Sequence, residues 1–190
     1  MKLLYISDIL LNRVGGGLNV RNDEVISLLQ HYRHDLMNQV QVIKGYLSMK
    51  KYNQVDNKLN EMIDEFEQER KLMGLNASSF VLWLIRFNSL HRNIRVTYNI
   101  HTKESVKEFD KELLYQCQQF INAIETVTLE SELYHVTIDL DKNLKNIELI
   151  ISIRGYFKDI YEMEAKLNML GKQLDSSMDR IIYKLIIPID

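Results

Sequence analysis

The chain has 190 residues, of which 46% are hydrophobic and 26% are charged, a balance typical of globular proteins rather than of disordered or fibrous ones. Its formal net charge of −2 lacks the basic excess that nucleic-acid binding requires, so we expect no nucleic-acid partner. The single cysteine, Cys117, cannot form an internal disulfide, and no apolar run is long enough to cross a bilayer. Composition therefore predicts a cytoplasmic protein with no membrane partner.

Residues 1–21 are predicted to form an N-terminal tail. Their first apolar stretch resembles a signal peptide superficially, but Asp8 interrupts it and no small-residue cleavage site follows. A glycine cluster at residues 14–19 predicts a flexible connector, because the Gly-Lys-Ser/Thr of a phosphate-binding loop is absent.

Residues 22–75 are predicted to form an antiparallel helical hairpin. Two apolar seams with alternating three- and four-residue spacing predict two long helices, separated by a polar turn at residues 50–54 and ending near Gly74. The seam of the first helix contains Val25, Leu29, Tyr32, Leu36, Val40, Ile43 and Leu47. A hairpin cannot cover its own seam, so we expect two chains to pair as a homodimer with a four-helix bundle. The alternative is packing against the rest of the same chain.

Residues 76–190 are predicted to form an α/β domain. A serine-capped helix at residues 78–91 precedes an alternating strand at residues 94–100. The elements expected after them are a helix at 109–130, strands at 133–140 and 146–153, a short helix at 161–170 and a strand at 180–189. The whole chain is therefore predicted to be an α+β protein, with a sheet on one side of this domain and helices on the other.

His34 is the residue of the first helix on which the functional prediction depends. At 100° per residue, His34 faces away from the apolar seam and into solvent, while Arg33 and Asp35 flank it. The same face carries Gln30, Asn38, Gln41 and Gly45, with His31 close by. Three interpretations remain from the residues alone: a solvated histidine without a role, a metal ligand together with His31 and Asp35, or a nucleophile.

The nucleophilic interpretation requires one free ring nitrogen on His34. Asp35 can hold the other nitrogen protonated, and Arg33 can offset the negative charge of an incoming phosphoryl group. Asn38, one turn on, can donate a hydrogen bond, and the small Gly45 permits close approach of another protein. A metal site is a weaker interpretation, because zinc prefers three or four ligands and the face offers few.

The segment "HYRHDLMNQVQVIKGYLSMKKY", residues 31–52, resembles the phospho-acceptor segment of the sporulation initiation phosphotransferase B family. Its Arg-His-Asp-x-x-Asn core is also similar to that of several bacterial sensor histidine kinases. The resemblance implies that His34 is phosphorylated, with Arg33, Asp35 and Asn38 as the other catalytic residues, and that the chain dimerises through its hairpin. It also implies a phosphorelay from the aspartate of one response regulator to that of another, with Gln30, Gln41 and Gly45 contacting these partners.

The C-terminal domain resembles a histidine-kinase ATP-binding domain without a nucleotide site. Asn122 stands where such kinases have an asparagine-bearing helix, but Arg154 replaces the expected adenine-binding aspartate and the glycine-rich loops are missing. We therefore expect the chain to bind no cofactor or metal of its own, with Mg²⁺ supplied by the response regulator. Two alternatives remain: a non-catalytic dimeric adaptor that docks response regulators, and, less favoured, an ATP-dependent histidine kinase.

Overall fold

The computed structural model describes residues 22–159, 165, 173–177 and 180–189. The chain divides into two compact units, Met1–Val55 and Asp56–Asp190. The predicted tail at residues 1–21, its glycine cluster and the short helix predicted at 161–170 lie outside the described residues, apart from Ala165.

The first unit contains α2 (Asn22–Ser48) and the first turn of α3 (Tyr52–Gly74). Between the helices, the Met49 amide donates to the Gly45 carbonyl at 3.1 Å, and Lys50 adopts a positive φ of 57°. The turn predicted at residues 50–54 therefore extends three residues too far, because α3 has already begun at Tyr52. Its predicted end near Gly74 is confirmed.

The remainder of α3 belongs to the second unit. Leu72 and Leu75 at its end are fully buried, and the Ile100 amide donates to Oε1 of Gln68 at 2.7 Å. The division of the chain into compact units thus falls inside α3, some way before the boundary predicted near Leu75.

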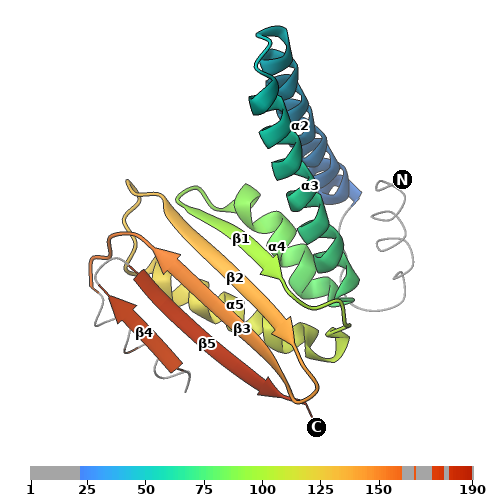
Figure 1. Cartoon of the computed structure of the whole chain (residues 1–190). Helices are drawn as coiled ribbons and strands as arrows, with labels where there is room; N and C mark the ends of the chain where they lie inside the picture. The colour runs from blue at the N-terminus through green and yellow to red at the C-terminus, as the bar shows by residue number, and fades with distance from the viewer. Residues whose placement is uncertain (1–21, 160–164, 166–172, 178–179, 190) are drawn as a thin grey trace. The chain divides into compact units, whose positions relative to one another are not determined.

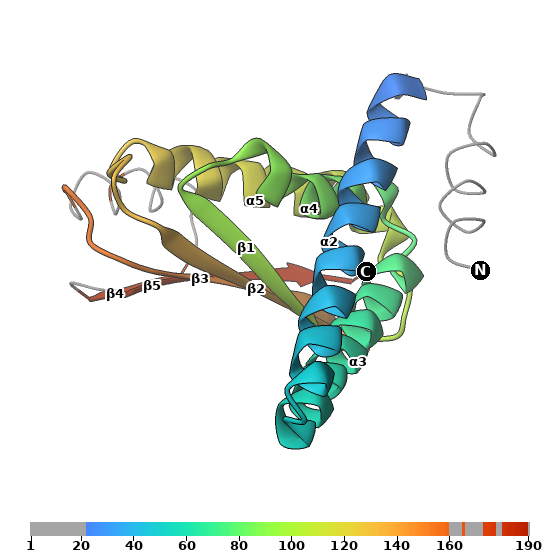
Figure 2. The ribbon, with the colours of Figure 1, turned by 90° about the horizontal axis from the view of Figure 1, so that it is seen from above.

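The second unit is an α+β sandwich, as predicted. Its five-stranded sheet has the order β1-β2-β3-β5-β4, in which only β1 and β2 run parallel. The strands are β1 (Ile94–Ile100), β2 (Tyr134–Lys142), β3 (Asn146–Arg154), β4 (Gln173–Ser177) and β5 (Arg180–Pro188). Figures 1 and 2 show α4 (Ser78–Leu90) and α5 (Asp110–Glu125) together on one face of this sheet.

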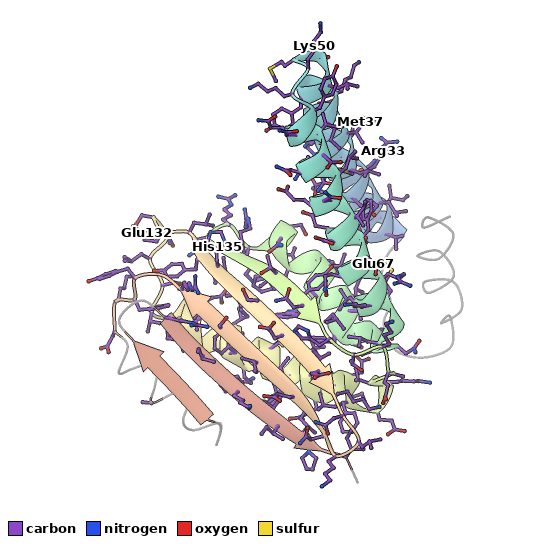
Figure 3. The ribbon with its side chains drawn as sticks, in the orientation of Figure 1. Arg33, Met37, Lys50, Glu67, Glu132 and His135 are labelled. Carbon is purple, nitrogen blue, oxygen red and sulfur yellow. The ribbon has the colours of Figure 1, made fainter. Side chains whose placement is uncertain are left out.

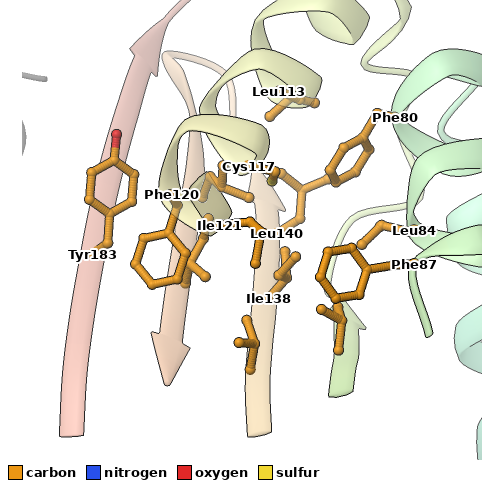
Figure 4. Packing of buried hydrophobic residues seen from close by; sticks show 14 of the residues in the cluster. Phe80, Leu84, Phe87, Leu113, Cys117, Phe120, Ile121, Ile138, Leu140 and Tyr183 are labelled. Atoms are coloured by element: carbon orange, nitrogen blue, oxygen red, sulfur yellow. The ribbon is translucent and has the colours of Figure 1, made fainter. Parts of the chain in front are cut away.

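The core lies between the sheet and these two helices (Figure 4). Strands β2 and β3 alternate strictly between buried and more exposed residues, so one face of each strand is apolar and packs against the helices. Fully buried members of this core include Tyr134, Ile138, Leu140, Phe80, Phe87, Leu113, Cys117 and Phe120.

Two predictions for this unit were wrong, and two elements were not predicted. The N-cap residue of α4 is Ala77 rather than a serine and provides no side-chain cap; the Asp110 carboxylate accepts hydrogen bonds from the Ser79 and Phe80 amides at 3.1 and 2.8 Å. Helix α5 ends at Glu125 rather than near residue 130; beyond its end, the amides of Val127 and Thr128 both donate to the Ile124 carbonyl. A short 3₁₀ helix, η1 (Lys107–Phe109), precedes α5, and strand β4 was not predicted.

Candidate functional site

His34 lies in the middle of α2 with 72% of its side chain exposed. The helix contains no proline or internal glycine before Gly45, and its half-buried residues recur at helical spacing, among them Tyr32, Leu36 and Ile43. His34 falls between these positions, as do its neighbours Arg33 and Asp35, which are also exposed. The helix therefore presents the imidazole to solvent, where another protein can reach it.

Two side chains contact the same nitrogen of His34. Oδ1 of Asp35 lies 3.3 Å from Nδ1, and the Asn38 amide nitrogen lies 3.2 Å from the same Nδ1. Asp35 is adjacent in sequence and Asn38 is one helical turn ahead, the spacing at which helical side chains meet. Because both contacts are made to Nδ1, neither of these side chains occupies Nε2 of His34.

These two contacts require different tautomers. Nδ1 must carry the proton in order to donate to Asp35, and it must be unprotonated in order to accept from Asn38. In the first tautomer Nε2 has a free lone pair and is nucleophilic; in the second, Nε2 carries the proton and is not. Asp35 and Asn38 therefore bias the reactivity of His34 in opposite directions.

His31 lies one turn before His34 and is exposed too. Its Nδ1 donates to the Ser27 carbonyl at 2.8 Å, which favours the tautomer with Nε2 free. Because a carbonyl is neutral, it compensates an imidazolium charge less than the carboxylate beside His34 does. The tautomer therefore does not favour His34 over His31, whereas the charge of the hydrogen-bond acceptor does.

The other predicted site residues lie along the same helix. Arg33 is exposed and labelled in Figure 3, and Gln30 and Gln41 are exposed one to two turns either side of His34. Gly45 is half-buried, and a Cβ built on it would meet nothing within 4 Å. The structure thus places all seven predicted positions on α2. The contact of Asn38 with the imidazole was missed, although the four-residue spacing was a signal for it.

The metal interpretation gains no support from the arrangement. Among the described residues, no group of three or more His, Cys, Asp or Glu side chains is placed to hold a metal ion. The Nδ1 atoms of His31 and His34 are both engaged in hydrogen bonds.

In the second unit, the two residues compared with kinase nucleotide sites lie apart. Asn122 is exposed on α5, in a groove that also includes Trp83, Phe87, His91 and Gln118. Arg154 ends β3 and is exposed, while its neighbour Ile153 is buried beneath the helices. Because neighbouring strand residues point to opposite faces, Arg154 lies on the face of the sheet away from α5. The structure does not bring Asn122 and Arg154 together.

Comparison with known proteins identifies the family. Residues 19–75 match the family described as sensor kinase SpoOB-type, alpha-helical domain, and residues 76–184 match the family described as sporulation initiation phosphotransferase B, C-terminal. The chain belongs to the sporulation initiation phosphotransferase B family. It is 30% identical over 141 residues to sporulation initiation phosphotransferase B of Bacillus subtilis (strain 168). The aligned residues cover 72% of this chain and 73% of that relative. The chain is thus homologous to a phosphotransferase.

Solved histidine kinase structures also resemble the chain, at low identity. The histidine kinase ThkA in complex with the response regulator protein TrrA is 16% identical, with 99% of this chain and 67% of that chain covered and a TM-score of 0.38. The histidine kinase domain from the Erythrobacter litoralis EL346 blue-light activated histidine kinase is 11% identical over 60% of each chain, with a TM-score of 0.40. Within the described part of the chain, no helix combines the length and apolar composition needed to span a membrane.

Proposed function

We propose that this protein is a phosphorelay phosphotransferase acting in the initiation of sporulation. In this role His34 accepts a phosphoryl group from the aspartyl phosphate of one response regulator and passes it to the aspartate of another. The observation that carries the proposal is the exposed imidazole of His34 with a carboxylate 3.3 Å from its Nδ1. We expect the exchange to take place in the cytoplasm, as the composition predicts.

The transfer needs a lone pair on Nε2 of His34 and no proton movement. Nε2 attacks phosphorus, the N–P bond forms, and the P–O bond to the donor aspartate breaks, so that the donor carboxylate leaves with the electron pair. Nδ1 keeps its proton, and the Asp35 carboxylate beside it compensates the positive charge of the phosphorylated ring. In the second transfer, the acceptor carboxylate attacks phosphorus and the N–P bond breaks.

The neighbouring residues contribute charge and access. Arg33 is placed next to His34 to offset the negative phosphoryl oxygens, and Asn38 can donate a hydrogen bond. Gln30, Gln41 and Gly45 give the partner a polar, sterically open surface along α2. Catalysis of this kind depends mainly on alignment and electrostatics. We expect the Mg²⁺ of the reaction to be bound by the response regulator.

We further propose that two chains pair through residues 22–75 as a four-helix bundle, while residues 76–190 form a domain that binds no nucleotide. Among the described residues of the single chain, nine of the fifteen large hydrophobic side chains that are exposed lie between Ile26 and Ile63. On α2, Val40 and Leu47 of the predicted seam are 46% and 53% exposed. Exposed apolar surface concentrated in this way is typical of a protein interface.

The test is phosphoryl transfer from a phosphorylated response regulator, followed by intact-protein mass spectrometry at neutral or alkaline pH, since phosphohistidine is lost in acid. We expect one phosphoryl group on the wild-type chain and none on His34→Gln, with unchanged circular dichroism because His34 is exposed. The matched control His31→Gln should keep much of the activity. ATP alone should not label the chain or bind saturably.

A phosphoryl group on the His34→Gln protein, or one lost only from His31→Gln, would overturn the assignment. If the wild-type chain binds the regulators but is never phosphorylated, it is an adaptor rather than a phosphotransferase. Stoichiometric labelling by ATP would instead show a kinase.

A further inference from the structure

Basic side chains form a row across the outer face of the sheet, defined here as the face opposite α4 and α5. Arg95 of β1 pairs with His135 of β2, His135 with Arg154 of β3, and Arg154 with Arg180 of β5, each directly opposite the next. The residues that alternate with them are buried on the helix side: Ile94, Tyr134, Ile153 and Ile181. All four basic residues therefore lie on the outer face.

Arg154 and Arg180 are directly opposed in this row, and like charges directly opposite one another destabilise a sheet. The Arg95 guanidinium has partners, since it donates to the His91 carbonyl at 2.6 Å and to the Ile94 carbonyl at 3.2 Å. In contrast, neither the Arg154 nor the His135 side chain has a hydrogen-bond or ion-pair partner among the described residues. Within this part of the chain, the two side chains at the centre of the row therefore keep donors available for an anion.

The row borders a polar depression of about 350 Å³ on the outer face. His135, Arg154 and Arg180 line one end of it, and Thr137 and Ser152, a directly opposed pair, supply hydroxyl groups in the next position along the strands. Asp139 lies beyond them. Along β2, the lining of the depression thus changes from basic side chains to hydroxyl groups and then to a carboxylate. Its volume is in the range of small-molecule sites.

We propose that this depression binds a small phosphomonoester with hydroxyl groups at its other end. The Arg154 guanidinium offers a planar fork of donors that matches two phosphate oxygens, Arg180 adds positive charge, and the His135 ring adds a nitrogen donor. The Asp139 carboxylate already accepts from Asn99 at 2.9 Å and lies 3.3 Å from the His101 ring. Its remaining lone pairs can accept from a ligand hydroxyl, whereas they would repel a second phosphate.

This arrangement favours a compact ligand with one anionic end over a polyanion that extends along the strands. The site lies wholly within the second unit and uses none of the residues around His34. It goes beyond the proposed phosphotransfer and does not depend on it.

The experiment titrates the full chain with inorganic phosphate and, separately, with glycerol 3-phosphate at constant ionic strength. Binding is followed by ¹H–¹⁵N NMR of backbone and arginine side-chain groups, and by calorimetry. We expect saturable shifts in β2, β3 and β5, with glycerol 3-phosphate binding more tightly than phosphate. Arg154→Gln should weaken both at least about tenfold, as expected for a bidentate charge-assisted contact.

Three further variants make the test specific. Lys111→Gln removes one charge from α5, on the helix side, and should change neither affinity. Arg154→Lys keeps the charge without the fork and should give an intermediate affinity. Asp139→Asn should weaken glycerol 3-phosphate but not inorganic phosphate. The proposal is wrong if neither compound binds saturably, or if Lys111→Gln and Arg154→Gln lose the same amount of affinity. It is also wrong if the chemical-shift changes are confined to α2.

Discussion

The competition between Asp35 and Asn38 for Nδ1 of His34 predicts that these two residues shift the tautomer of His34 in opposite directions. Asp35 stabilises the tautomer with a nucleophilic Nε2, and Asn38 stabilises the unreactive one. Asn38→Ala removes the amide donor, and Asp35→Ala removes the carboxylate acceptor. Alanine favours helix, so neither change should disturb α2.

The size of each effect follows from the exposure of the site. The side chains of His34 and Asp35 are 72% and 77% exposed, so water competes with both contacts. An exposed contact of this kind contributes about 1 kcal/mol or less, which corresponds to at most about a fivefold change in the ratio of the two tautomers. We therefore expect Asn38→Ala to raise the ratio of the Nδ1-protonated to the Nε2-protonated tautomer by up to about fivefold, and Asp35→Ala to lower this ratio by a similar factor.

The measurement is ¹⁵N NMR of the His34 ring nitrogens at about pH 8.5, where an ordinary imidazole is neutral. Transfer rates from a phosphorylated response regulator are measured on the same samples. In Asp35→Ala the transfer rate should fall, because the reactive tautomer becomes less populated. In Asn38→Ala two effects on the rate oppose each other: the reactive tautomer becomes more populated, but the phosphoryl group loses a hydrogen-bond donor. Gln41→Ala, on the same face, serves as the matched control and should leave the tautomer ratio unchanged.

A lower Nδ1-protonated fraction in Asn38→Ala would refute the competition. It would mean that the carboxamide presents Oδ1 rather than its nitrogen to the ring, so that Asn38 and Asp35 act together. An unchanged ratio in both variants would mean that neither contact sets the tautomer in solution.

Three other predictions concern assembly and stability. Val40→Asp should dissociate the proposed dimer in sedimentation experiments by placing a charge in the predicted apolar seam, whereas Val42→Asp, equally exposed but about 200° away around the helix, should not. Asp110→Ala should lower the free energy of unfolding in urea by about 2 kcal/mol, because two amides at the start of α4 lose their acceptor. Burial raises the pKa of both Cys117 and Tyr183 above the usual range, so the unfolded chain loses these protons at lower pH than the folded chain does. The free energy of unfolding should therefore fall as the pH rises above about 8.5, which urea unfolding between about pH 7 and 10 would measure.

Local patterns were sufficient to predict most of the secondary structure. The strand at Ile94–Ile100 was predicted with its observed bounds, because apolar and polar residues alternate without interruption between two loops. The end of α3 at Gly74 was marked by a glycine in a helical pattern. What these patterns could not supply were contacts between distant residues. Asp110 caps α4 from about 30 positions away, and no local rule selects it over the serines at the start of the helix.

Strand β4 was missed for a related reason. Its sequence, Gln173–Ser177, lacks an apolar alternation, and it is held in the sheet by pairing with β5 alone. At the candidate site, helical geometry predicted which residues share a face with His34. It did not show that Asp35 and Asn38 meet at one ring nitrogen, because that depends on side-chain rotamers rather than on spacing.

The chemistry proposed for His34 and the choice of its partners have different structural origins. Both side chains that contact its ring come from within four residues on α2, so the tautomer is set locally and would be the same beside any regulator. In the proposed reaction, a local motif of this kind would contact only the phosphoryl group and the atoms next to it, so it could not distinguish one response regulator from another. Discrimination must therefore come from surfaces that the motif does not include, such as the turns of α2 around Gln30, Gln41 and Gly45 or the second unit. Substitutions on those surfaces should change how tightly a regulator binds, while leaving the rate of transfer within the bound complex nearly unchanged.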